Sequence, residues 1–243
     1  ALALNTGRAC LNYILQQTKP DKVYIPYYTC DTVLEPINLN NTIFEYYSID
    51  ENLNPDDIVI GENEYFYFIN YFGIKSGIIS TLVKKYGKNL IVDNSQGFFE
   101  KKYEDIWSFN SARKFFGVPD GAYLYSPLSL KNDFPINKNI KYNHLINRLL
   151  GNQELAYKQY NINESRLNSE IKQISLFSKK ILGYIDYEMI SNKRKNNFQY
   201  LSNNLNKINT LNIPGNYKCA PICYPFFPKD IIDRKIFIEN NIF

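Results

Sequence analysis

The chain has 243 residues, of which 44% are hydrophobic and 21% charged, and its formal net charge at pH 7 is +4. These values are typical of a soluble globular protein and allow one large α/β domain, or one domain with part of a second. The basic residues are scattered apart from Lys193, Arg194 and Lys195, so the charge pattern indicates no nucleic-acid partner. The single histidine, His144, would have to carry any Ser-His or Cys-His catalysis, which argues against those schemes.

Two of the four cysteines, Cys219 and Cys223, have a spacing that could supply half of a metal site. Such a site needs further ligands, and His144 lies far away in the sequence, so we expect no metal. We recognise no secretory signal and no apolar run long enough to span a bilayer. The expectation is therefore a cytoplasmic protein without membrane contact, with its thiols reduced.

Apolar periodicity predicts the secondary structure in chain order. A helix is expected over 9–17, where Thr6 offers a capping side chain and Gly7 a flexible start. A second helix is expected over 78–86 and ends at Gly87. Short strands are predicted over 22–26, 43–47, 57–60, 65–69, 89–93, 106–109 and 122–125.

Short apolar strands that alternate with helices predict a mostly parallel central sheet covered on both faces, which is a three-layer α/β/α fold. After Pro127 the character changes, with helix dominating 154–185 and a polar-faced helix over 192–208. Strand character resumes over 219–227.

We place a domain boundary near residue 190. Residues 1–190 would form the large α/β domain with its trailing helices, and residues 191–243 the start of a small C-terminal α+β domain. Both ends of the chain interrupt an apolar or helical pattern, so we expect flanking segments on either side.

Three positions carry candidate chemistry. Asp93 ends the buried run 90–92, at the strand edge where open α/β sheets bind ligands, although a turn-forming or capping aspartate fits equally. Lys114 lies among aromatic residues, where desolvation would make its amine nucleophilic; the alternative is a surface lysine lying over apolar neighbours. Gly7 opens a helix whose free N–H groups could hold a phosphate, with Arg8 adding a charge-assisted bond.

The order of these features resembles that of pyridoxal-phosphate (PLP) enzymes with the aspartate-aminotransferase fold. A phosphate cradle comes first, then the strand-end Asp93, then a serine-containing turn with Lys114. In such enzymes a carboxylate keeps the pyridine nitrogen protonated, so that the ring acts as an electron sink.

More specifically, the sequence resembles the DegT/DnrJ/EryC1/StrS family of sugar aminotransferases, well over 4–125 and loosely to about 208. Six segments carry this resemblance: 4–11 to "SGT-A-L", 23–29 to a strand with "P-x-x-T", 70–73 to "H-x-x-G", 92–97 to "E-D-A-A-Q-A/S", 108–117 to "F-S-F-x-x-x-K" and 120–122 to "G-E-G-G".

The resemblance implies a transaminase that moves an amino group, with glutamate as donor, to a keto group of a nucleotide-linked sugar, for surface polysaccharide or related glycan biosynthesis. Lys114 would be the Schiff-base lysine and general base. Asp93 would pair with the pyridinium nitrogen, and Gln96 would contact the ring oxygen of the cofactor.

The same resemblance implies a phosphate site. Gly7 would take the glycine position, and Arg8 and Ala9 would supply backbone amides. The stretch before the lysine is one residue longer than the family's usual form, so either Ser108 or Ser111 could be the phosphate hydroxyl.

The resemblance also implies a homodimer with shared active sites. Asn147 and Arg148 are candidates for the loop that completes the site of the other subunit, and an ordinary polar loop is the alternative. Asn70 replaces a histidine of the family and is a candidate substrate contact. Tyr27 or Tyr28 could stack near the cofactor ring, with core packing as the alternative for each.

Three further interpretations stay open. A PLP protein that dehydrates a sugar is one, but that branch of the family has histidine in place of Lys114. A degenerate member that binds a ligand or partner without catalysis is motivated by Arg8 and Asn70 and opposed by Asp93 and Lys114. An unrelated nucleotide-binding α/β protein is the third, but the sequence has no G-x-G-x-x-G motif.

Overall fold

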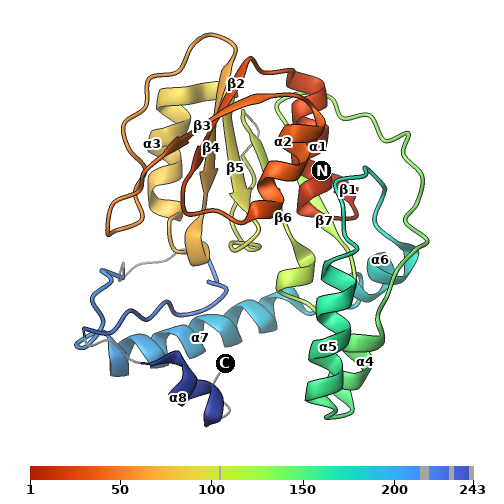
Figure 1. Cartoon of the computed structure of the whole chain (residues 1–243), viewed down its shortest axis with the longest axis vertical. Coiled ribbons are helices and arrows are strands. Elements are labelled where there is room, and N and C mark those ends of the chain that lie inside the picture. The colour runs from red at the N-terminus through yellow and green to blue at the C-terminus, as the bar shows by residue number, and fades with distance from the viewer. Residues whose placement is uncertain (104, 214–218, 230–232, 241–243) are drawn as a thin grey trace.

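A seven-stranded sheet forms the centre of the computed structural model, which describes residues 1–103, 105–213, 219–229 and 233–240 (Figure 1). The strand order is β1-β7-β6-β5-β4-β2-β3. Pairing is parallel from β3 through β2, β4 and β5 to β6, whereas β7 runs antiparallel to β6 and β1 antiparallel to β7. The strands are β1 (Leu2–Leu4), β2 (Lys22–Pro26), β3 (Ile43–Tyr47), β4 (Glu64–Ile69), β5 (Leu90–Asn94), β6 (Trp107–Asn110) and β7 (Ala122–Tyr125).

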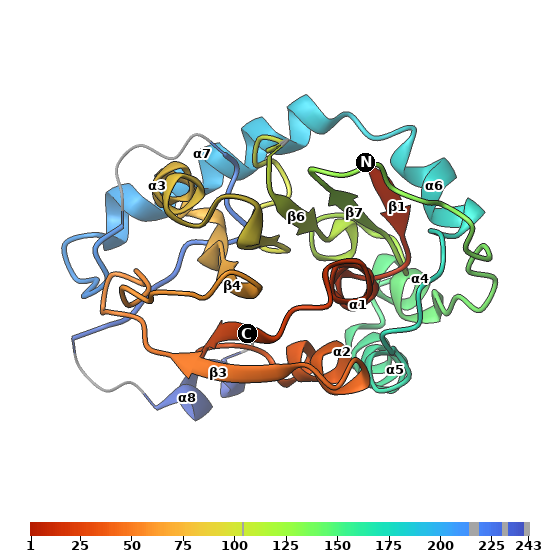
Figure 2. The same ribbon diagram turned by 90° about the horizontal axis from the view of Figure 1, so that it is seen from above.

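Helices cover both faces of this sheet, with α1 and α2 on one side and α3 on the other (Figure 2). The helices are α1 (Gly7–Thr18), α2 (Leu34–Leu39), α3 (Ser76–Tyr86), α4 (Asn143–Leu149), α5 (Gln153–Glu164), α6 (Leu176–Leu182), α7 (Tyr187–Leu205) and α8 (Arg234–Glu239). The predicted three-layer α/β/α fold with a mostly parallel sheet is therefore confirmed.

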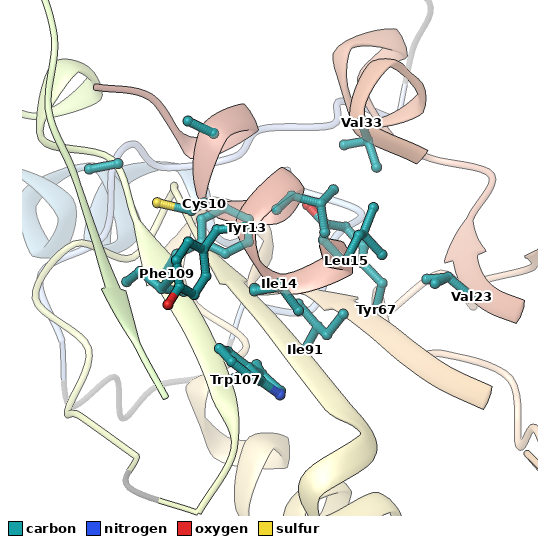
Figure 3. Packing of buried hydrophobic residues seen from close by; sticks show 14 of the residues in the cluster. Cys10, Tyr13, Ile14, Leu15, Val23, Val33, Tyr67, Ile91, Trp107 and Phe109 are labelled. Atoms are coloured by element: carbon teal, nitrogen blue, oxygen red, sulfur yellow. The ribbon is translucent and has the colours of Figure 1, made fainter. Parts of the chain in front are cut away.

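Strand β4 shows how one short sequence builds two cores. Its alternate side chains point to opposite faces, so Tyr67 and Ile69 pack towards α1 while Phe66 and Phe68 pack towards α3. Figure 3 shows the α1 side, where Ile14 and its helical neighbours lie against β4, β5 and β6. A strand buried on both faces is continuously apolar, which is the pattern that predicted it.

Two predicted strands are wrong. Residues 57–60 form no strand: Ile58 and Ile60 pack onto the α3 core, and the Tyr86 hydroxyl donates to the Ile58 carbonyl. Among residues 219–227 the described backbone forms no strand, although the Ile222 N–H donates to the Phe72 carbonyl over 3.0 Å. Both segments have strand-like composition, but a strand also needs a hydrogen-bonded neighbour.

The predicted helix over 154–185 is interrupted. Helix α5 ends at Glu164 and α6 begins at Leu176, and between them the chain runs along β1, with the Ile174 N–H donating to the Ala3 carbonyl. The sequence also did not predict β1, α2, α4 and α8. Residue 190, where we place the domain boundary, lies inside α7. The division of the chain into two domains stays a prediction.

Candidate active site

A cavity of about 550 Å³ opens at the carboxyl edge of the parallel strands. Its walls come from the start of α1 and from the segments that follow β2, β4, β5 and β6, and α5 with the loop after it closes one side. This is the edge at which open α/β sheets bind ligands, because the loops that leave successive strands meet there.

The start of α1 forms one wall. Thr6 caps the helix by accepting the Ala9 N–H at Oγ1 over 3.0 Å. The Ala9 amide, which we predicted to bind phosphate, therefore already has a hydrogen-bond partner. A Cβ at Gly7 would lie 3.3 Å from a Phe109 ring carbon and 3.4 Å from Ser95 Oγ. Glycine therefore lets the helix terminus, with its unpaired N–H groups, approach the sheet closely.

The side chain of Arg8 is engaged elsewhere. Its Nη1 donates to Glu35 Oε2 over 3.2 Å and to the Leu167 carbonyl over 2.7 Å. The other oxygen of Glu35 accepts the Ser169 N–H. Nη1 of the guanidinium thus ties α2 to the loop after α5. Arg8 still lines the cavity, where its backbone N–H and its other guanidinium donors can meet an anion.

Asp93 lies in the cavity wall with both carboxylate oxygens hydrogen-bonded. Oδ1 accepts the Ser95 N–H and Oδ2 accepts the Tyr67 hydroxyl, each over 2.6 Å. Burial and the nearby carboxylate raise the pKa of Tyr67 well above its ordinary value, so the phenol keeps its proton and remains a donor. Asp93 forms a local turn, as one interpretation predicted, and also presents its charge to the cavity.

Gln96 has an oriented amide. Its Oε1 accepts the Phe72 N–H over 2.9 Å, so its NH₂ group is the part left to donate into the cavity. Phe72 and Gly73 have φ values of 56° and 75°, and a Cβ at Gly73 would lie only 2.5 Å from the Gln96 carbonyl. The turn that holds Gln96 therefore requires glycine at position 73.

Lys114 ends the 3₁₀ turn Ala112–Lys114 and lines the cavity. Its side chain is exposed, so the predicted desolvation by aromatic neighbours is wrong: Phe115 and Phe116 point into a separate buried cluster. The preceding Arg113 donates to the Pro119 carbonyl over 2.8 Å and forms an ion pair with Glu164 of α5. The turn is thereby fixed while the amine reaches the cavity.

The structure distinguishes the two candidate serines. Ser111 lines the cavity, together with Phe109 two residues earlier. Ser108 is buried within β6, where the pleat places it on the face opposite Phe109. Of these two serines, Ser111 is therefore the one that can contact a ligand in the cavity.

Asn70 does not reach the cavity. It is fully buried, its Nδ2 donates to Asn94 Oδ1, and its Oδ1 accepts the Lys75 N–H, each over 2.9 Å. The prediction of a substrate contact at Asn70 is wrong, because this amide joins β4, β5 and the start of α3.

Of the two predicted tyrosines, only Tyr28 lies at the cavity. Tyr27 and Tyr28 are 70% and 57% exposed, so core packing is wrong for both. Tyr28 lines the cavity and stacks on Tyr71 with ring centroids 5.4 Å apart, whereas Tyr27 stacks on Tyr46.

Asn147 and Arg148 lie in α4, a helix rather than the predicted loop. Asn147 Nδ2 donates to Gln159 of α5, and Arg148 is exposed. Neither lines the cavity of the same chain. A contact of Asn147 or Arg148 with the active site of a second subunit therefore stays a prediction.

Several cavity residues were not predicted. Tyr67 reads as an ordinary core tyrosine in its apolar strand, and Thr29 has a buried hydroxyl for which the described residues supply no hydrogen-bond partner. Tyr160 and Glu164 come from α5, far from the other motifs along the chain. Thr29 ends the segment that resembles "P-x-x-T", so its motif could have indicated it. No local pattern marks the other three, because packing of distant elements brings them to the site.

Fold and cavity together define a three-layer α/β protein with a cavity at the carboxyl edge of its sheet. The sugar aminotransferase CalS13 from Micromonospora echinospora has this fold, with a TM-score of 0.60 at 14% identity over 98% of this chain and 70% of that one. Spr1654 from Streptococcus pneumoniae, assigned as a sugar aminotransferase, gives 0.59 at 12% identity over 95% and 66%. AtS13 from Actinomadura melliaura gives 0.56 at 12% identity over 98% and 69%.

The similarity extends to structure but not to sequence. No protein-family model and no curated protein sequence matches the chain. At 12–14% identity, the structural similarity establishes that the chain has the fold of the sugar aminotransferases, as the sequence motifs predicted. The chain spans 66–70% of the length of these three structures.

Two further findings concern other classes of site. In the described part of the chain, no helix is both long and apolar enough to cross a bilayer. The described residues also contain no cluster of three or more histidine, cysteine or acidic side chains that could hold a metal ion. Cys219 donates instead to Glu100 over 3.3 Å.

Proposed function

We propose that the chain is a PLP-dependent aminotransferase that aminates a keto group of a nucleotide-linked sugar. One observation carries this proposal: the start of α1, Asp93 on β5, and the turn after β6 with Ser111 and Lys114 are three separate segments that line one cavity. A phosphate cradle, a carboxylate and an amine are the three groups that PLP chemistry needs.

The residues fit the cofactor. The N–H groups of Gly7 and Arg8, with the Ser111 hydroxyl, would hold its phosphate. Asp93 would hold the proton on the pyridine nitrogen, and the NH₂ of Gln96 would donate to the ring oxygen. The bound cofactor would supply an electron sink for the carbon that loses its proton.

Lys114 would hold the cofactor covalently and, once an incoming amine releases it, would act as the base that removes the proton from the α-carbon of the bound donor. Its exposure to the cavity supports this role, since a general base must reach the substrate. Glutamate as donor and a nucleotide-linked acceptor are what the sequence resemblance implies. The structural likeness to CalS13, a sugar aminotransferase, supports a sugar as the acceptor.

We further propose a homodimer whose subunits share active sites. Helices α4 and α5 expose large apolar side chains, among them Leu149, which is 83% exposed, and Tyr157. Helix α5 also closes one side of the cavity. A second subunit packed on these helices would bury that surface next to the site. The exposed Arg148 of each subunit could then contact the active site of the other.

An absorption experiment tests the function. Protein mixed with PLP should develop a visible band that borohydride fixes to the chain. Glutamate added before borohydride should remove the band and yield one equivalent of 2-oxoglutarate, because the amino group passes to the cofactor and frees the lysine. A well-folded protein without such a band would leave a role in binding or scaffolding only.

Replacing Tyr67 by phenylalanine tests the support of Asp93. The change removes the O–H that donates to Asp93 Oδ2 over 2.6 Å. A hydrogen bond to a charged group contributes about 1.5–3 kcal/mol, so the free energy of unfolding should fall by that order. The Kd for PLP should also rise, because the carboxylate loses one of its two fixed partners. Urea denaturation and PLP titration measure the two effects.

The matched control is Tyr65→Phe. Tyr65 lies two residues earlier on the same strand and the same face, away from the cavity. It should leave the Kd for PLP unchanged. Equal affinity in Tyr67→Phe and Tyr65→Phe would show that the Tyr67 hydroxyl does not support the site.

A further inference from the structure

The turn that carries Lys114 is braced from α7 by one arginine, Arg194. Its Nη2 donates to the carbonyl of Phe115, the residue directly after Lys114, over 3.3 Å. Its Nη1 donates to the Ile222 carbonyl over 3.1 Å. The guanidinium carbon also lies 4.7 Å from the centre of the Phe115 ring. One side chain therefore joins three segments that are distant in sequence.

The brace continues to the opposite wall of the cavity. Ile222, held by Arg194 through its carbonyl, donates its own N–H to the Phe72 carbonyl over 3.0 Å. Phe72 in turn donates its N–H to Gln96 Oε1 over 2.9 Å. Arg194 is thus connected on one side to the lysine turn and on the other to the glutamine turn.

The surroundings of Arg194 indicate that this contact matters. Its side chain is half-buried, and burial lowers its pKa. Phe115 packs within an aromatic cluster, with Phe98 at 5.7 Å and Phe116 at 6.3 Å between ring centroids. Carbonyl dipoles and a ring face, rather than water, therefore solvate much of this cation.

We propose that Arg194 is a positioning residue for Lys114: by fixing the Phe115 carbonyl it sets the direction from which the lysine amine enters the cavity. This inference rests on the proposed function in taking Lys114 as the cofactor lysine. Arg113 holds the turn on its other side, through Pro119. With both neighbours of Lys114 fixed, the backbone of the turn cannot rotate away from the cavity.

The chemistry of arginine suits the task. A planar guanidinium donates in two directions at once and stacks on an aromatic ring, whereas an ammonium is a compact point charge. Arg194→Lys should keep the charge and lose the simultaneous bridge. Arg194→Met should keep the packing of the stem and lose both hydrogen bonds.

The first test follows attachment of PLP to Lys114 by stopped-flow absorption. Displacing a reacting group by about 1 Å can cost on the order of 100-fold in rate, so we expect a loss of about tenfold or more in Arg194→Met. Arg194→Lys should fall between Arg194→Met and the wild type. The control is Lys193→Met, which removes the adjacent exposed cation of the same helix and should attach PLP at the wild-type rate.

The second test needs no cofactor. Lysines are labelled by reductive ¹³C-methylation, the Lys114 signal is identified with Lys114→Arg, and its pH titration is followed by NMR. In Arg194→Met and Arg194→Lys this signal should change its shift and titration midpoint, and in Lys193→Met it should not. A purely structural role would lower thermal stability without moving this signal selectively.

The outcomes separate the two proposals. A wild type that never attaches PLP would overturn the proposed function, while the ¹³C signal would still test the brace. Wild-type attachment rate and an unchanged Lys114 signal in a folded Arg194→Met would overturn the positioning role. If Arg194→Met does not fold, the same result in Arg194→Lys would overturn it.

Discussion

Lys114→Ala is expected to abolish the band that borohydride fixes and to reduce transamination by roughly 10³-fold or more, because the variant loses both the covalent attachment and the general base. PLP should still bind reversibly, since the phosphate cradle and Asp93 are intact. Because Lys114 is exposed, the free energy of unfolding should change by less than about 0.5 kcal/mol.

Absorption spectra before and after borohydride, mass spectrometry of the reduced chain and amino-transfer assays measure these effects. The control is Lys88→Ala, an exposed lysine that precedes β5 at the other edge of the sheet. It should behave as the wild type. Persistence of a borohydride-fixed adduct in Lys114→Ala would show that another amine holds the cofactor.

Asp93→Asn is expected to lower the transamination rate by about 10²- to 10³-fold, the order of loss seen when one preorganised electrostatic partner is removed from an active site. The asparagine keeps the shape of the side chain but carries no charge, so the proton on the pyridine nitrogen loses its partner. The cofactor should still attach to Lys114, because the lysine turn does not depend on Asp93.

The same variant has a measurable structural effect. Both oxygens of Asp93 accept hydrogen bonds, from Ser95 N–H and from the Tyr67 hydroxyl, and an amide can accept only one of them. Loss of the other should cost about 1–3 kcal/mol of unfolding free energy, measured by urea denaturation. Asp21→Asn, an exposed site before β2, is the control. Full activity in Asp93→Asn would contradict the role of the carboxylate.

The layered fold could be predicted because its signals are local. β2 to β7 are short apolar runs, and α1 and α3 have apolar side chains at helical spacing. The periodicity within each segment is therefore enough to predict its secondary structure. The errors at 57–60 and 219–227 have a common cause. Their composition suits a strand, but pairing depends on which chain segment lies alongside, and that information is not local.

Four of the residues that line the cavity could be predicted for a related reason. Gly7, Asp93, Gln96 and Lys114 each follow or precede a recognisable element, and the carboxyl ends of parallel strands meet at one edge. A strand-end residue is therefore placed near other strand-end residues by topology alone.

The remaining features depend on three-dimensional packing. The pleat of β6 turns Ser108 away and leaves Ser111 at the cavity, a difference of a few residues that motif length could not resolve. Asn70 became a buried structural amide because its neighbours on β5 and α3 satisfy its hydrogen bonds. Contacts such as Arg194 with Phe115 join segments 79 residues apart. Periodicity and motifs are properties of neighbours along the chain, whereas these contacts arise from the register and packing of elements far apart in it.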